Sequence, residues 1–188
     1  AGVALAATVE GESYEELEWL MGINYWGVVY GTKEFLPYLK QSGEGHIINT
    51  SSIFGLTSQP TQSAYNSSKF AVRGFTESLR QELDIENCGV SALCVHPGGI
   101  RTNIANDARL SDSMKKIGMN PEKSIKSFNK LMRKPAVEAS QEILDAVLKN
   151  KRRLLIGGDA VTVDLMQRIL PTGYQKIVTI ATKLSKRF

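Results

Sequence analysis

The sequence has few cysteines, no long apolar run and little net charge. Cys88 and Cys94 are its only cysteines, and they show neither metal-ligand spacing nor a disulfide framework, so we expect reduced thiols, no metal and a cytoplasmic protein. No apolar run approaches the roughly 18–20 residues of a membrane-spanning helix, and Ala1-Gly2-Val3 lacks the basic start of a signal peptide. With 42% hydrophobic residues among 188, one soluble globular domain is expected.

The formal net charge is only +4, and its basic excess lies near the C-terminus. This part of the chain contains only two acids, Asp159 and Asp164, and many more bases, namely Lys149, Lys151, Arg152, Arg153, Arg168, Lys176, Lys183, Lys186 and Arg187. Aromatic residues do not alternate with these bases, and no nucleic-acid-binding motif is present. The pattern therefore favours a solvated basic face over a nucleic-acid partner.

The first half of the chain predicts a helix, a strand and a second helix. Acidic residues after Ser13 indicate an N-capped helix over the apolar periodic stretch 17–39, which glycines and Asn24 divide into two. The β-prone run 46–51 predicts a strand. Apolar residues four apart over 64–86 predict a second helix, with Gly89 as its C-cap glycine.

The second half repeats the alternation. The apolar run 90–95 predicts a strand buried on both faces, 136–149 a helix, and 152–156 a short strand. Residues 101–134 are polar and irregular in pattern, in contrast to the helical pattern that follows them. This alternation indicates βαβ units and an α/β fold with a doubly wound parallel sheet, whose ligands bind beyond the carboxyl ends of the strands.

Residues 159–188 are basic and amphipathic, and they are broken by Pro171 and Gly173. We therefore divide the chain into residues 1–158, the domain portion that contains the candidate site, and residues 159–188, a C-terminal extension. The extension either packs on the domain portion or a partner subunit, or lies on a membrane surface; packing is the simpler reading.

Tyr65 and Lys69 open the second predicted helix four residues apart, which puts the phenol and the ammonium on one face. A nearby cation lowers the pKa of a phenol, so such a pair can move a proton. With six tyrosines and fourteen lysines, roughly 0.45 such pairs arise by chance. Ser52, thirteen residues upstream at the end of a predicted strand, makes coincidence much less probable.

These motifs resemble the short-chain dehydrogenase/reductase family. The resemblance rests on Tyr65-x-x-x-Lys69, the helical Asn24, the run Asn49-Thr50-Ser51-Ser52 and the run Pro97-Gly98-Gly99-Ile100-Arg101-Thr102. It covers residues 1–158 and implies a Rossmann-like fold, with NAD or NADP as the cofactor.

The resemblance also implies a role for each residue. Tyr65 would be the general acid or base, Ser52 would hydrogen-bond the substrate oxygen, and Asn24 would support a water relay. Lys69 would hold the ribose hydroxyls of the cofactor and lower the pKa of Tyr65. Gly2, at the end of a segment like the family's Asn-Asn-Ala-Gly motif, would contact the cofactor, as would Pro97, Gly98, Ile100 and Thr102.

Each residue also has a simpler interpretation. Ser52 could cap the following turn, Asn24 could be a local backbone partner, and Pro97-Gly98 could be only a turn. His46 and His96 are interpreted as structural, because nothing in the sequence pairs them with a nucleophile.

The family's glycine-rich nucleotide-binding turn does not precede these motifs, so the chain resembles only the C-terminal part of the family's sheet. We therefore expect three strands, an unpaired edge at 46–51, and no activity of this segment alone. The complete protein is expected to interconvert a secondary alcohol and a ketone or aldehyde, with a lipophilic compound as the expected substrate, and to form a homodimer or homotetramer. The alternatives are an epimerase or dehydratase, or a non-catalytic nucleotide-binding scaffold.

Overall fold

A computed structural model describes residues 2–185. Three parallel strands form its main sheet in the order β2-β3-β5, namely β2 (Gly45–Thr50), β3 (Val90–Pro97) and β5 (Arg153–Ile156). A separate parallel pair joins β1 (Leu5–Ala6) to β4 (Arg109–Leu110). The predicted parallel α/β fold is confirmed, and β2 pairs only with β3 among the described residues, as expected for that edge.

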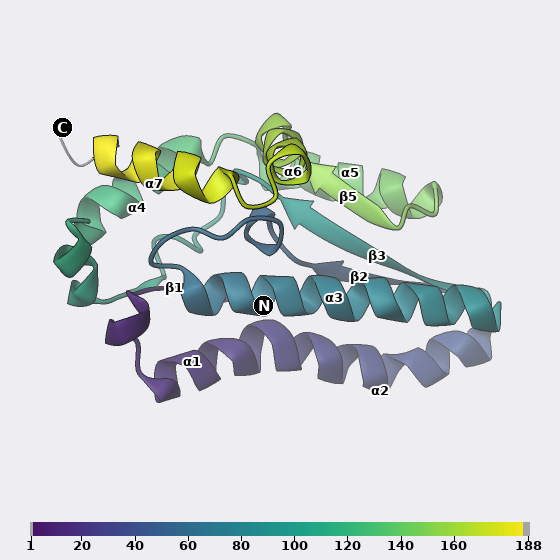
Figure 1. Cartoon of the computed structure of the whole chain (residues 1–188). Coiled ribbons are helices and arrows are strands. Elements are labelled where there is room, and N and C mark those ends of the chain that lie inside the picture. The colour runs from purple at the N-terminus through teal and green to yellow at the C-terminus, as the bar shows by residue number, and fades with distance from the viewer. Residues whose placement is uncertain (1, 186–188) are drawn as a thin grey trace.

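Helices cover both faces of the sheet (Figure 1). One layer contains α1 (Tyr14–Met21), α2 (Gly27–Ser42) and α3 (Ser63–Glu86). The other contains α4 (Pro121–Leu131), α5 (Ala136–Leu148), α6 (Gly158–Ile169) and α7 (Tyr174–Ser185). Short helical turns are η1 (Val9–Gly11), η2 (Gly22–Trp26), η3 (Ile53–Gly55) and η4 (Asp112–Ile117).

Strand β3 is the centre of the core, because side chains on both of its faces are buried. Ala92 packs with Ile47 and with Leu79 and Leu83 of α3 on one side. Leu93, Val95 and Ile156 pack with Ala139 and Ala146 of α5 on the other. The sequence prediction of a strand buried on both faces is confirmed.

The helix after Ser13 begins with the predicted cap. The Ser13 hydroxyl accepts a hydrogen bond from the Glu16 backbone N–H at 3.2 Å, and the Glu16 carboxylate accepts one from the Ser13 N–H at 3.4 Å. The predicted interruption around Asn24 is a π-helical turn, η2, between α1 and α2. A π turn inserts an extra residue, and it turns Asn24 inward, where the side chain is buried.

The predicted C-cap of the second helix was wrong. Helix α3 ends at Glu86, and its C-cap is Asn87, which adopts the left-handed conformation at φ 53°. Asparagine takes this conformation at low cost, so the helix stops before Gly89. Gly89 (φ 77°) instead allows two backbone segments to approach closely, because a Cβ on it would lie 1.9 Å from the Gly43 carbonyl oxygen.

We expect Gly89→Ala to lower the free energy of unfolding by roughly 2–4 kcal/mol, since it adds both backbone strain and a steric clash. Gly74→Ala is the matched control, because Gly74 lies in α3 with open space around it. That control should raise the free energy of unfolding by roughly 0.5–1 kcal/mol. Urea unfolding measures both, and equal stability of the two variants would contradict the role of Gly89.

The interpretation of residues 101–134 as irregular was also wrong, because they contain β4, η4 and α4. The α4 start is built by Pro121 at the first helical position and by Asn120, whose side chain accepts a hydrogen bond from the Lys123 N–H at 2.9 Å. The two ends of the segment 101–134 are held together, since the Arg101 N–H donates to the Lys134 carbonyl at 2.8 Å.

The C-terminal segment divides at the predicted position, with α6 ending at Ile169 and α7 beginning at Tyr174. Helix α6 packs near β5 and η3, and the Ser58 N–H donates to the Tyr174 hydroxyl at 3.1 Å. The division of the chain at residue 158 stays a prediction, and Lys186 and Arg187 lie outside the described residues. None of the helices within residues 2–185 combines the length and apolarity needed to cross a bilayer.

Candidate active site

Ser52 lies just beyond β2, at the carboxyl edge of the sheet. The preceding residue is fixed, because the Ser51 N–H donates to the Val95 carbonyl at 2.8 Å and the Ser51 hydroxyl donates to the Lys69 carbonyl at 2.8 Å. The Ser52 hydroxyl accepts a hydrogen bond from the Phe54 N–H at 3.1 Å. Ser52 therefore has the capping role that the sequence left open, and it also forms a hydrogen bond with Tyr65.

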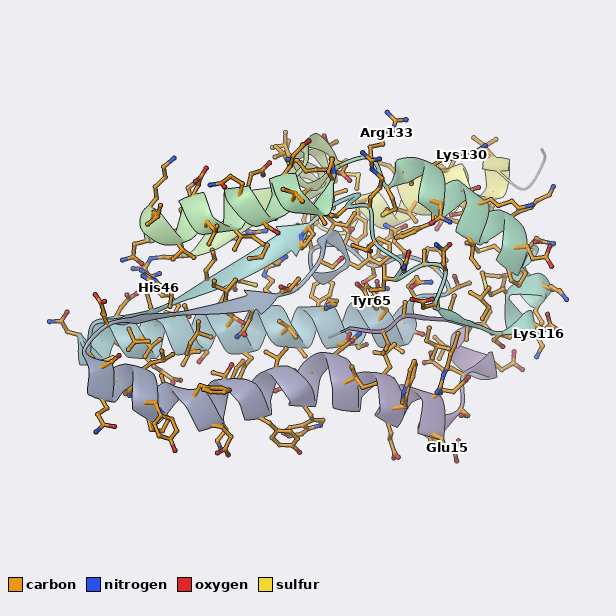
Figure 2. All side chains as sticks on the ribbon, turned by 180° about the vertical axis from the view of Figure 1, so that it is seen from behind. Glu15, His46, Tyr65, Lys116, Lys130 and Arg133 are labelled. Carbon is orange, nitrogen blue, oxygen red and sulfur yellow. The ribbon has the colours of Figure 1, made fainter. Side chains whose placement is uncertain are left out.

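Tyr65 (Figure 2) and Lys69 lie on the first turns of α3, and their spacing of four residues puts them on the same face. The Lys69 Nζ lies 5.6 Å from the centre of the Tyr65 ring and donates to the Thr50 carbonyl at 3.1 Å. The Phe54 ring packs edge-on against Tyr65, with 5.9 Å between ring centres. The structure thus brings Ser52, Tyr65 and Lys69 together where β2 ends.

Burial controls the protonation of both groups. It raises the pKa of Tyr65 to about 12, and the hydrogen bond with Ser52 acts more weakly in the opposite direction. Burial also lowers the pKa of Lys69 to about 8. The Lys69 ammonium bonds the Thr50 carbonyl and faces the Tyr65 ring, and burial, not this cation, sets the direction of the Tyr65 pKa shift. The resting phenol is therefore protonated at neutral pH.

Asn24 connects the N-terminal segment to α3. Its side-chain oxygen accepts from the Val3 N–H at 2.9 Å, and its amide nitrogen donates to the Val3 carbonyl at 2.9 Å and to the Ser68 hydroxyl at 3.3 Å. In this structure the Asn24 side chain is therefore a hydrogen-bond partner of nearby backbone, the simpler of its two interpretations. Gly2 adjoins this contact, since a Cβ on it would lie 3.6 Å from the Asn24 side-chain oxygen.

Pro97 and Gly98 lie at the carboxyl end of β3, the strand next to β2. The Gly98 N–H donates to the Ile156 carbonyl at 2.9 Å. Ile100 is buried in the core cluster beside β5, and Thr102 is exposed on the following loop. Pro97 and Gly98 thus adjoin the Ser52 edge, whereas the structure places the Ile100 side chain in the core and Thr102 at the surface.

The sequence reasoning missed Asp159. The Gly99 N–H donates to the Asp159 carboxylate at 2.6 Å, and a Cβ on Gly98 would lie 2.2 Å from the same carboxylate. Asp159 comes from the start of α6, so it ties the C-terminal helices to the Gly98-Gly99 turn. The signal available in the sequence was Gly157-Gly158-Asp159 directly after the third strand, at the same edge of the sheet.

One histidine lies far from the proton-transfer groups, and the other does not titrate near neutral pH. His46 lies at the opposite end of the sheet from Tyr65 (Figure 2). His96 is fully buried; its Nδ1 lies 2.9 Å from the Ser52 carbonyl oxygen, and burial lowers its pKa to about 4. Within residues 2–185, no cluster of three His, Cys, Asp or Glu side chains is suited to a metal ion.

Comparison with known proteins gives the family. The short chain dehydrogenase profile matches residues 1–113. The chain is 41% identical over 179 residues to SadH of Mycobacterium tuberculosis, covering 95% of this chain and 63% of SadH. It is 31% identical over 173 residues to mouse dehydrogenase/reductase SDR family member 7B, covering 92% of this chain and 51% of that protein. The chain belongs to the short-chain dehydrogenase/reductase family.

Solved structures agree on the fold. A short-chain dehydrogenase from Streptomyces avermitilis is 27% identical with a TM-score of 0.75, covering 99% of this chain and 67% of that one. A family member from Burkholderia phymatum, solved in complex with NAD, has a TM-score of 0.77 at 24% identity, over 91% of this chain and 64% of that one. The predicted Rossmann-like fold is confirmed, and the chain spans 63% of the length of SadH.

Proposed function

We propose that this chain carries the catalytic part of an NAD(P)-dependent oxidoreductase that interconverts a secondary alcohol and a ketone or aldehyde. The observation that carries the proposal is the convergence of Ser52, Tyr65 and Lys69 at the carboxyl edge of the sheet. Parallel sheets of this kind bind their ligands at that edge. Family membership supports the same class of chemistry.

In the proposed reaction the Tyr65 hydroxyl gives its proton to the carbonyl oxygen of the substrate, and Ser52 donates a hydrogen bond to that oxygen. A bound nicotinamide supplies or accepts the hydride. The raised pKa of Tyr65 keeps the phenol protonated at rest, which supports its role as an acid in carbonyl reduction. Phe54 and Phe128, 6.4 Å apart between ring centres, place apolar surface beside Tyr65. That surface supports a lipophilic substrate.

The chain's own residues fit a nicotinamide dinucleotide. Lys69 is only 6% exposed and makes one hydrogen bond within the described residues, so its ammonium keeps N–H donors for ribose hydroxyls. Gly2 is exposed and adjoins Asn24, while the Gly98-Gly99 turn follows the neighbouring strand. We assign these residues, with Pro97, Ile100 and Thr102, to the side of the cofactor that carries the nicotinamide, and we leave NAD and NADP as alternatives.

Asn24 is proposed to position neighbouring residues and not to react with the substrate itself. Its amide holds Val3 and Ser68, so it fixes the N-terminal segment against α3, next to Lys69. We propose Asn24 as a positioning residue that supports a water relay to Lys69, consistent with the family resemblance. Trp26, at the end of η2, and Tyr30 of α2 stack on each other and are exposed. They support a homodimer or homotetramer formed through these helices.

Asp159→Ala is expected to raise the KM for the cofactor about tenfold with a smaller change in kcat, because the Gly98-Gly99 turn loses a charge-assisted hydrogen bond. Asp159→Asn is the matched control, since its side-chain oxygen can still accept from the Gly99 N–H. Steady-state kinetics of the complete protein measure both. An unchanged cofactor KM in Asp159→Ala would show that the turn does not depend on this carboxylate.

The experiment that tests the proposed function follows NADH and NADPH absorbance against a panel of ketones and aldehydes, using the protein expressed from its complete native reading frame. We expect consumption of one cofactor with at least one lipophilic carbonyl compound. An epimerase or dehydratase would convert its substrate without net cofactor consumption, and a binding scaffold would bind cofactor without any turnover.

A further inference from the structure

Helix α7 carries an apolar stripe on its outer side. Ile177, Ile180 and Leu184 are 46%, 58% and 53% exposed, and with Ala181 they follow the i, i+3, i+4, i+7 spacing of one helical face. The side of α7 that faces the rest of the molecule lies beside this stripe: Tyr174 is buried, its hydroxyl accepts the hydrogen bond from Ser58, and Val178 and Thr182, four and eight residues further on, are half-buried. The aliphatic side chains of the stripe itself are left largely uncovered by the described residues.

The preceding helix extends the exposed apolar surface. On α6 the outward residues Val161, Leu165 and Ile169 are spaced four apart, and Leu170 follows them. Each has an exposed fraction above 40%, so the two C-terminal helices together present seven exposed aliphatic side chains, namely Val161, Leu165, Ile169, Leu170, Ile177, Ile180 and Leu184. A cluster of this size on the surface marks a binding surface more often than chance.

Exposed lysines border the apolar stripe of α7. Lys176 and Lys183 are exposed, and their spacing of seven residues puts both along one edge of the α7 stripe. The sequence continues with Lys186 and Arg187. Apolar side chains bordered by lysines are typical of helices that lie in the interface between lipid headgroups and acyl chains.

The charge of the whole chain is polarised in the same direction. Residues 108–134 contain eight bases and two acids, residues 151–188 also contain eight bases and two acids, and the rest of the chain contains seven bases and fifteen acids. Figure 2 shows Lys130 and Arg133 on the α4 side of the molecule and Glu15 on the opposite side, at α1. An anionic surface would therefore attract the α4 and α7 side and repel the α1 side.

We propose that the outer face of α7, with the adjoining apolar residues of α6, docks this protein onto an anionic lipid surface. Aliphatic side chains would enter the interface, and Lys176 and Lys183 would pair with lipid phosphates. A second copy of the chain is the other occupant that such a face could take. The bordering lysines disfavour it, because two like-charged faces would meet.

Docking is tested by co-sedimentation of the complete native protein with phosphatidylcholine vesicles and with vesicles that also contain phosphatidylglycerol. We expect binding only to the anionic vesicles, with loss at high salt. Lys176→Gln and Lys183→Gln should each weaken binding about fivefold. The double variant Ile180→Glu/Leu184→Glu should weaken it about tenfold or more.

Two matched controls separate this face from general surface effects. Ile85 is 85% exposed on α3, so Ile85→Glu changes an even more accessible aliphatic residue outside the α7 stripe. Lys33→Gln removes a charge from the exposed side of α2. Both should leave vesicle binding unchanged. Equal binding to neutral and anionic vesicles, no binding at all, or binding that the α7 variants do not alter would overturn the proposal. A dimer that dissociates in Ile180→Glu/Leu184→Glu would assign the face to a second copy instead.

Discussion

Tyr65→Phe is expected to lower kcat/KM for carbonyl reduction by about a hundredfold to ten-thousandfold, the usual contribution of a positioned acid or base. The phenylalanine ring keeps the contact with Phe54 but has no proton to give. Cofactor binding should change little, because the substitution leaves Lys69 in place. Steady-state kinetics and a fluorescence titration of NAD(P)H binding, both on the complete native protein, measure the two effects separately.

Tyr30→Phe is the control for this substitution, since Tyr30 is 60% exposed on α2 and stacks only on Trp26 among the described ring contacts. It should retain the activity of the unsubstituted protein. If Tyr65→Phe also kept activity within a few-fold, Tyr65 would not be the acid, and the proposed function would lose its principal group. If Tyr65→Phe lost both activity and cofactor binding, the phenol would have a structural role instead.

Lys69→Met should produce opposite effects on activity and stability. Activity should fall about a hundredfold or more, because the cofactor loses a hydrogen-bond donor and the site loses its cation. The fold should become more stable by roughly 1–3 kcal/mol at pH 7, because burial of the charged lysine is unfavourable and methionine has a similar shape. Urea unfolding and steady-state kinetics measure the two quantities.

The destabilisation of the fold by Lys69 depends on pH. The pKa of Lys69 is about 8 in the folded chain and near its ordinary value of 10.5 when unfolded, so the folded state binds fewer protons between these values. The destabilisation by Lys69 is therefore fully present below about pH 8 and disappears as the pH rises towards 10.5. The stability advantage of Lys69→Met should shrink over the same range. A variant that is less stable than the parent at pH 7 would contradict this account of Lys69.

Periodicity and spacing predicted the elements that position the site. The strands at Ser52 and Pro97, the helix that starts near Tyr65 and the break at Asn24 are all present, because each depends on a local pattern of apolar residues or on a nearby cap. The spacing of Tyr65 and Lys69 predicted their shared face for the same reason. Their proximity to Ser52 followed from parallel topology, because the helix after a parallel strand begins at the edge where that strand ends.

What sequence reasoning missed depends on contacts between distant residues. The carboxylate of Asp159 reaches Gly99, sixty residues away, and no local pattern reports that contact. The direction of the Tyr65 pKa shift was not predictable either, because spacing indicates a nearby cation but not how deeply the phenol is buried. Helix α4 was missed although Asn120 and Pro121 signal its start, since its polar composition hid the periodicity.

The most direct test of the proposed chemistry uses NAD(P)H that carries deuterium at the transferable position of the nicotinamide. After reduction of a ketone by the complete native protein, mass spectrometry locates the label. We predict one deuterium on the carbinol carbon of the alcohol, one cofactor oxidised for each alcohol formed, and loss of this transfer in Tyr65→Phe. Product formation without deuterium in the alcohol, or without net cofactor oxidation, would contradict hydride transfer assisted by Tyr65.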